Sequence, residues 1–116
     1  MHIITIPNWR PMSDNVYCKG HWSIRYRKKK EDAEFVQAYA AQSNIPKAET
    51  KRRVSVEVIV SKGRTPDPTN ILKSLMDALV SCKLLVDDNA EWSELGGVLV
   101  KKGADARTII ILEDLS

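Results

Sequence analysis

The chain has 116 residues, of which 43% are hydrophobic and 28% charged, with a formal net charge of +3. This length suits one domain with one core and is too short for two, so we expect a single domain over residues 1–116. The apolar runs are too short to span a membrane. The first residues also lack the basic leader and apolar core of a secretion signal, which favours a cytoplasmic protein.

Elements in the first half of the chain follow from local patterning. Residues 1–7 predict a short strand that ends at a proline, and residues 8–30 predict irregular structure in which aromatic and basic side chains alternate. A helix is expected over residues 31–44, with acidic side chains in its first turn and apolar ones on a single face. Residues 52–60 alternate between valine and polar residues, which is typical of a strand with one buried face.

The second half adds one helix and two strands. A helix is expected from about residue 68 to residue 82, followed by a polar turn at residues 87–89. Strands over residues 92–102 and 107–114 are joined by a turn at residues 103–105. The resulting order, β-α-β-α-β-β, predicts an α+β fold with two helices on a mixed sheet.

The two cysteines and two histidines exclude several kinds of site. Cys18 and Cys82 are far apart and do not form a CxxC motif, which indicates free thiols in a reducing compartment. With only His2 and His21 besides, ligands for a structural zinc ion are lacking. A nuclease based on histidine is excluded for the same reason.

Charge is distributed in blocks along the chain. Residues 1–30 carry seven basic side chains and one acid, and residues 51–65 carry five basic side chains and one acid. Residues 66–98 carry six acids and two lysines. An acidic patch between basic flanks fits a surface for a polyanion with a cation site inside it. The alternative is an ordinary solvated surface.

The acids around the second helix also have two interpretations. In the simpler one, Asp67 is the N-cap of an amphipathic helix, Pro68 takes its first position, and Lys73 and Asp77 form an i,i+4 ion pair. The adjacent acids that follow the apolar segment "KLLV" favour a second interpretation, because like charges side by side are unfavourable unless they are solvated, capping or bound to a cation. Oxygen ligands of this kind suit Mg²⁺, with Mn²⁺ as an alternative.

The order of these residues forms a recognisable motif. Asp67, Asn70 and Lys73 are followed by the triplet "DAL" at residues 77–79 and by the pair "DD" at residues 87–88. Near the N-terminus, residues 11–17 read P-x-S-x-N-x-Y. Together these motifs resemble the RusA family of Holliday-junction resolvases, which are small phage and bacterial endonucleases. The resemblance spans most of the chain.

The resemblance implies a homodimeric, Mg²⁺-dependent endodeoxyribonuclease that resolves four-way DNA junctions by paired nicks during recombination and repair. Such a protein would act in the cytoplasm of a bacterium or a phage-infected host. Carried over by position, Asp67 and Asp88 are the catalytic, metal-binding carboxylates and Lys73 is the catalytic lysine. Asp87 is a further metal-binding acid beside them. The expected products carry a 5′-phosphate.

One position departs from the family pattern. Thr69 stands where the family usually has its second aspartate, so the expected metal site has one negative charge fewer. Thr69 can offer a hydroxyl ligand, and Asp77 or Glu57 can supply the missing charge, with Asn70 as a supporting residue. The alternative is a branched-DNA-binding protein that has lost its metal-dependent activity through Thr69.

Side chains expected to contact DNA are basic, or belong to the N-terminal motif. They are Asn15, Tyr17, Arg25, Arg27, Lys28, Lys29, Lys30, Arg52, Lys62 and Arg64. A solubilising role is the alternative for any one of the basic residues. A nuclease of the PD…(D/E)xK type is disfavoured, because no strand after Asp67 carries an acid-x-Lys pair.

Overall fold

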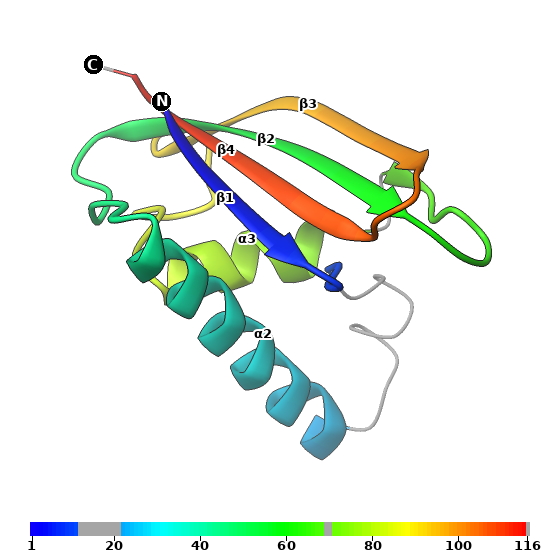
Figure 1. Ribbon diagram of the computed structural model, residues 1–116. Helices are drawn as coiled ribbons and strands as arrows, with labels where there is room; N and C mark the ends of the chain where they lie inside the picture. Colours follow the sequence, from blue (N-terminus) through cyan, green and yellow to red (C-terminus); the bar gives the residue numbers. More distant parts are fainter. Residues whose placement is uncertain (12–21, 69–70, 116) are drawn as a thin grey trace.

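The computed structural model describes residues 1–11, 22–68 and 71–115 (Figure 1). It confirms the predicted α+β class and the predicted order of elements. In chain order these are β1 (His2–Pro7), α2 (Trp22–Gln42), β2 (Lys51–Val60), α3 (Leu72–Ser81), β3 (Ser93–Lys102) and β4 (Arg107–Leu115).

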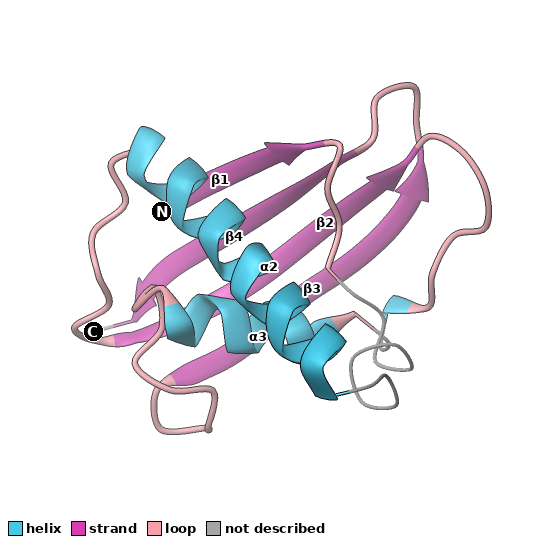
Figure 2. Ribbon diagram, turned by 90° about the horizontal axis from the view of Figure 1, so that it is seen from below, coloured by secondary structure: helices cyan, strands magenta, loops and turns pink. Residues whose placement is uncertain are grey.

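The four strands form one mixed sheet in the order β1-β4-β2-β3. β4 runs antiparallel to both of its neighbours, whereas β2 and β3 are parallel. Parallel neighbours need a crossover connection, and α3 provides it. Both helices lie on the same face of the sheet, and no described helix covers the other face (Figures 1 and 2).

The core lies between the sheet and the two helices. Alternate residues of β2 point into it, so Val54, Val56 and Val58 are buried, as the valine pattern predicted. Leu75 and Leu79 of α3 are fully buried against the same cluster. The radius of gyration is 13.5 Å, close to the roughly 13.4 Å expected for a compact domain of this length.

Helix α2 begins at Trp22, about nine residues before the predicted start, so the expectation of irregular structure up to residue 30 is wrong for its last part. The predicted acidic first turn is therefore also wrong. Lysine and arginine favour helix almost as well as leucine, although a run of them has no apolar periodicity to reveal it. The end was predicted closely: Asn44 adopts a left-handed conformation (φ 55°), and the Ile45 amide donates to the Ala40 carbonyl, which caps the helix.

Helix α3 is shorter than predicted. It begins at Leu72, its N-cap is Ile71, and no side chain caps it. The interpretation of Asp67 as N-cap of this helix and Pro68 as its first residue is therefore wrong, although Pro68 itself has a 3₁₀ conformation. The ten residues of α3 span about 15 Å, which is shorter than the helix predicted over residues 68–82 would be.

A buried carboxylate joins α2 to the segment that follows β1. Asp32 is 5% exposed and accepts a hydrogen bond from Trp9 Nε1 at 3.1 Å. Burial raises the pKa of Asp32, and the hydrogen bond from Trp9 opposes that effect only in part. Because the folded chain then binds this proton more readily than the unfolded chain, the free energy of unfolding falls as pH rises through the folded-state pKa.

We therefore expect Asp32→Asn to be more resistant to urea than the native protein at pH 7. The amide oxygen can still accept from Trp9, and no charge has to be buried. The advantage should shrink as pH falls and vanish below the unfolded-state pKa of about 3.9. Urea titrations over this pH range measure it, with Glu34→Gln as the control because Glu34 is exposed on the same helix. A lower urea midpoint for Asp32→Asn at pH 7 would contradict the argument.

Candidate active site and nucleic-acid surface

Asp67 and Lys73 lie near the carboxyl end of β2. Asp67 is exposed in the segment between β2 and α3, and Lys73 is exposed in the first turn of α3. Within the described residues Lys73 makes no hydrogen bond or ion pair, so the predicted pair with Asp77 is not formed. Asp77 is half-buried on α3. Lys73 therefore presents its charge to solvent.

The chain reverses sharply after α3. Lys83 adopts a left-handed conformation (φ 62°), and the Leu84 amide donates to the Leu79 carbonyl, which ends the helix. Leu84 is buried beneath the sheet, and the Ala48 amide donates to the Lys83 carbonyl at 2.8 Å. This reversal brings the segment after α3 to the amino end of β2.

Asp87 and Asp88 lie in a polar turn within this segment, and the two carboxylates differ. Both oxygens of Asp87 are used locally: Oδ1 accepts from the Asp88 amide at 2.7 Å and Oδ2 from Asn89 Nδ2 at 3.4 Å. Asn89 in turn accepts from the backbone amides of Glu91 and Trp92. The Asp88 carboxylate is exposed and makes no contact of this kind within the described part of the chain. Asp87 thus shapes the turn, whereas Asp88 is available to a ligand.

The two ends of this motif are far apart in a single chain. Since β2 and β3 are parallel, the segment leaving β2 and the segment entering β3 lie at opposite ends of the sheet (Figures 1 and 2). The ten residues of α3, about 15 Å long, lie between Asp67 and Asp88. Two ligands of one Mg²⁺ each approach it to about 2.1 Å. One chain therefore does not bring these carboxylates to a common ion.

The other possible metal ligands of the described residues do not form a site either. Among residues 1–11, 22–68 and 71–115, no group of three or more histidine, cysteine, aspartate or glutamate side chains is placed to hold a metal ion. The donor chemistry suits a hard cation, but the spacing in one chain does not. Thr69 and Asn70 lie outside the described residues.

Basic side chains predicted to contact DNA are exposed in two places. Arg27, Lys28, Lys29 and Lys30 form an exposed run on α2, and Lys62 and Arg64 are exposed after β2. Asn15, Tyr17 and the side chain of Arg25 lie outside the described residues.

No helix among the described residues is long and apolar enough to cross a membrane.

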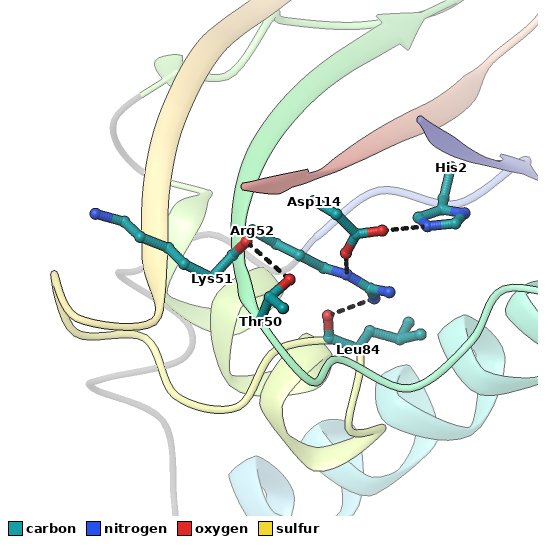
Figure 3. A network of polar contacts seen from close by, with 6 residues as sticks. All are labelled: His2, Thr50, Lys51, Arg52, Leu84 and Asp114. Carbon is teal, nitrogen blue, oxygen red and sulfur yellow. Dashed lines mark hydrogen bonds and ion pairs between the residues drawn. The ribbon is translucent and has the colours of Figure 1, made fainter. Parts of the chain in front are cut away.

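Arg52 has a different position from the one predicted. It is 1% exposed, so its prediction as a DNA contact is wrong. Its Nε donates to Asp114 Oδ1 at 2.7 Å and its NH1 to the Leu84 carbonyl at 3.0 Å (Figure 3). The alternation of valines in β2 could have predicted this burial. Position 52 lies two residues before Val54 on the strand, so both side chains face the core.

His2 completes this network from β1. Its Nε2 lies 2.9 Å from Asp114 Oδ2, so Asp114 joins the central strand to the edge strand (Figure 3). Hydrogen bonds from Arg52 and then from His2 hold the pKa of Asp114 below its usual range. The network also fixes Leu84, from which the chain continues to Asp87 and Asp88. Arg52 is thus a residue that positions the acidic turn.

No family model matches the chain, and a search among curated proteins found no similar one.

Proposed function

We propose that this protein is a Mg²⁺-dependent endonuclease that acts on branched DNA as a homodimer. The observation that carries the proposal is the ordered motif Asp67, Lys73, Asp87 and Asp88 around the crossover helix of a β-α-β-α-β-β fold. Exposed Lys73 and Asp88, each without a protein partner among the described residues, support it. The charge of the exposed run on α2 favours a phosphate backbone as ligand.

The separation of the two carboxylates in one chain favours a site built from two copies. In a two-fold dimer, Asp67 of one protomer can approach Asp88 of its partner, and symmetry then produces two such sites. Two sites related by symmetry suit paired cuts in a four-way junction. In such a site Asp67 and Asp88 would hold Mg²⁺, which would lower the pKa of a bound water and polarise the phosphodiester. Lys73 stabilises negative charge on the phosphoryl oxygens.

The test is a cleavage assay on a synthetic four-way junction and on a linear duplex of matched sequence. We expect nicks in the junction with Mg²⁺ or Mn²⁺ and none with a chelator. Equal cleavage of both DNAs would contradict the assigned specificity. Tight junction binding without cleavage under any cation would favour the alternative, a branched-DNA-binding protein without activity. The substitution of threonine for the family aspartate at position 69 is the observation behind that alternative.

A further inference from the structure

A cavity of about 260 Å³ lies where β1 and β2 end. Among the described residues, its apolar lining consists of Trp9, Ile59, Val60 and Ala106. Ile59 and Val60 are almost fully buried, so they form a fixed floor, whereas Trp9 and Ala106 are half-buried. The volume is below the roughly 300–1,000 Å³ of pockets for drug-sized ligands, and it suits one small planar group.

The wall of this cavity is held by three hydrogen bonds, to Ala106 in the turn before β4, to β4 and to α2. The Asn8 amide donates to the Ala106 carbonyl at 2.9 Å, and Thr108 Oγ1 donates to the Trp9 carbonyl at 2.6 Å. The bond from Trp9 Nε1 to Asp32 fixes the indole against α2. A ligand would therefore meet a wall that is already formed, which lowers the entropic cost of binding.

The polar lining is cationic. Arg10 and Lys62 are exposed beside Asn8 and Ser61, and none of the described residues that line the cavity is acidic. A second cavity on the protein differs in this respect, because Lys47 and Arg52 there are balanced by Glu49 and Asp114. An apolar floor with two cations at its rim matches a ligand that has a planar apolar part and an anionic part.

We propose that this cavity binds one unpaired nucleotide of a DNA strand. The base packs against the apolar lining that includes Trp9, and the adjoining phosphate contacts Arg10 and Lys62. Lys62 belongs to the segment between β2 and α3 that also carries Asp67, so the cavity lies at the Asp67 end of the sheet. The inference that the ligand is DNA rests on the proposed function. If both hold, the nuclease prefers substrates with an unpaired base.

The test compares two linear duplexes that differ by one unpaired thymidine, with chelator present and at one salt concentration. Fluorescence anisotropy should show that the bulged duplex binds about five-fold or more tightly, the lower bound for stacking of one base. Thymidine 5′-monophosphate should compete better than inorganic phosphate. Equal affinities for the two duplexes would overturn the proposal. Competition by poly-glutamate as strong as that by the nucleotide would overturn it in favour of an acidic protein partner.

Two variants locate the effect. Ala106→Leu fills the cavity without changing charge, so it should abolish the preference and leave binding of the paired duplex unchanged. Lys62→Ala should reduce the preference for the bulged over the paired duplex, whereas Lys102→Ala should leave that preference unchanged. Lys102 is exposed and pairs with Val60 across the ladder, but it does not line the cavity. This lysine pair still decides the question if Ala106→Leu fails to fold, which circular dichroism reports.

The two proposals fail separately. A protein that cuts junctions but binds both duplexes equally would overturn the cavity assignment alone. A protein that prefers the bulged duplex but cuts no DNA would overturn the nuclease assignment alone.

Discussion

Mixing Asp67→Asn with Asp88→Asn subunits is expected to restore DNA cleavage that neither variant performs alone. Each homodimer lacks one carboxylate at both of its sites. If each site takes Asp67 from one protomer and Asp88 from its partner, a mixed dimer has one doubly substituted site and one intact site. At equal mixing about half of the dimers are mixed, so about a quarter of the native number of sites should be active. The product should be a singly nicked junction.

The measurement is cleavage of a four-way junction after the two variants are unfolded together and refolded. Junction binding should stay within a few-fold of native for each variant, because the exposed basic run on α2 is untouched. Refolding each variant with native subunits is the control for exchange, because mixed dimers with one intact site should release singly nicked junctions in place of paired cuts. Activity in either homodimer alone would contradict the roles of Asp67 and Asp88. Two inactive homodimers whose mixture stays inactive, despite exchange, would contradict the shared site.

Asp114→Ala is expected to lower the free energy of unfolding by about 3 kcal/mol, the lower end of the range for breaking a buried ion pair. It leaves the Arg52 guanidinium, whose side chain is 2% exposed, without its carboxylate. Among the described residues the Leu84 carbonyl then remains as its hydrogen-bond partner. We use the lower end of this energy range because the Asp114 side chain is itself about half exposed, so water can approach the ion pair. Urea unfolding at pH 7 measures the loss.

Glu113→Ala is the matched control for this result. Glu113 precedes Asp114 on β4 and accepts from Arg53 NH1 at 2.8 Å, but both partners are more than a third exposed. Its removal should cost less than about 1 kcal/mol. Adding Arg52→Met to Asp114→Ala should recover much of the loss, because no unpaired charge then remains buried. Equal losses for Asp114→Ala and Glu113→Ala would contradict the special role of the buried pair.

The same pair predicts a loss of stability in acid. Because the pKa of Asp114 is lower in the folded chain than in the unfolded one, its contribution is complete above the unfolded-state pKa of about 3.9. That contribution disappears as pH falls through the folded-state pKa. The difference in stability between native protein and Asp114→Ala should therefore narrow in strong acid.

Local patterns predicted the strands well because strand identity here depends on alternation. Valine at every second position of β2 marked the buried face of this strand. Arg52 lies on the same face, so the same alternation predicts that it is buried although it is charged. The start of α2 was missed because its first turns are rich in arginine and lysine, which form helix without an apolar stripe.

The candidate site depended on information that local patterns do not carry. Whether Asp67 meets Asp88 is decided by the direction in which β3 returns beside β2, and this pairing joins Arg52 to Ser93, far along the chain. Because β3 runs parallel to β2, Asp67 and Asp88 lie at opposite ends of the sheet. Their order in the sequence motif had instead predicted that both belong to one metal site. The motif thus predicted which residues belong to the proposed chemistry but not that a single chain holds them apart.

The position of β1 has a consequence for the order in which the chain folds. Its described ladder partner is β4, so His2 pairs with Leu112 and a loop of more than one hundred residues must close. Such non-local pairing slows folding, and β2, α3 and β3 can assemble before it forms. During synthesis the apolar side chains of Ile4 and Ile6 therefore stay exposed on an unpaired strand until residues 107–112 leave the ribosome. In this interval the chain is most exposed to aggregation.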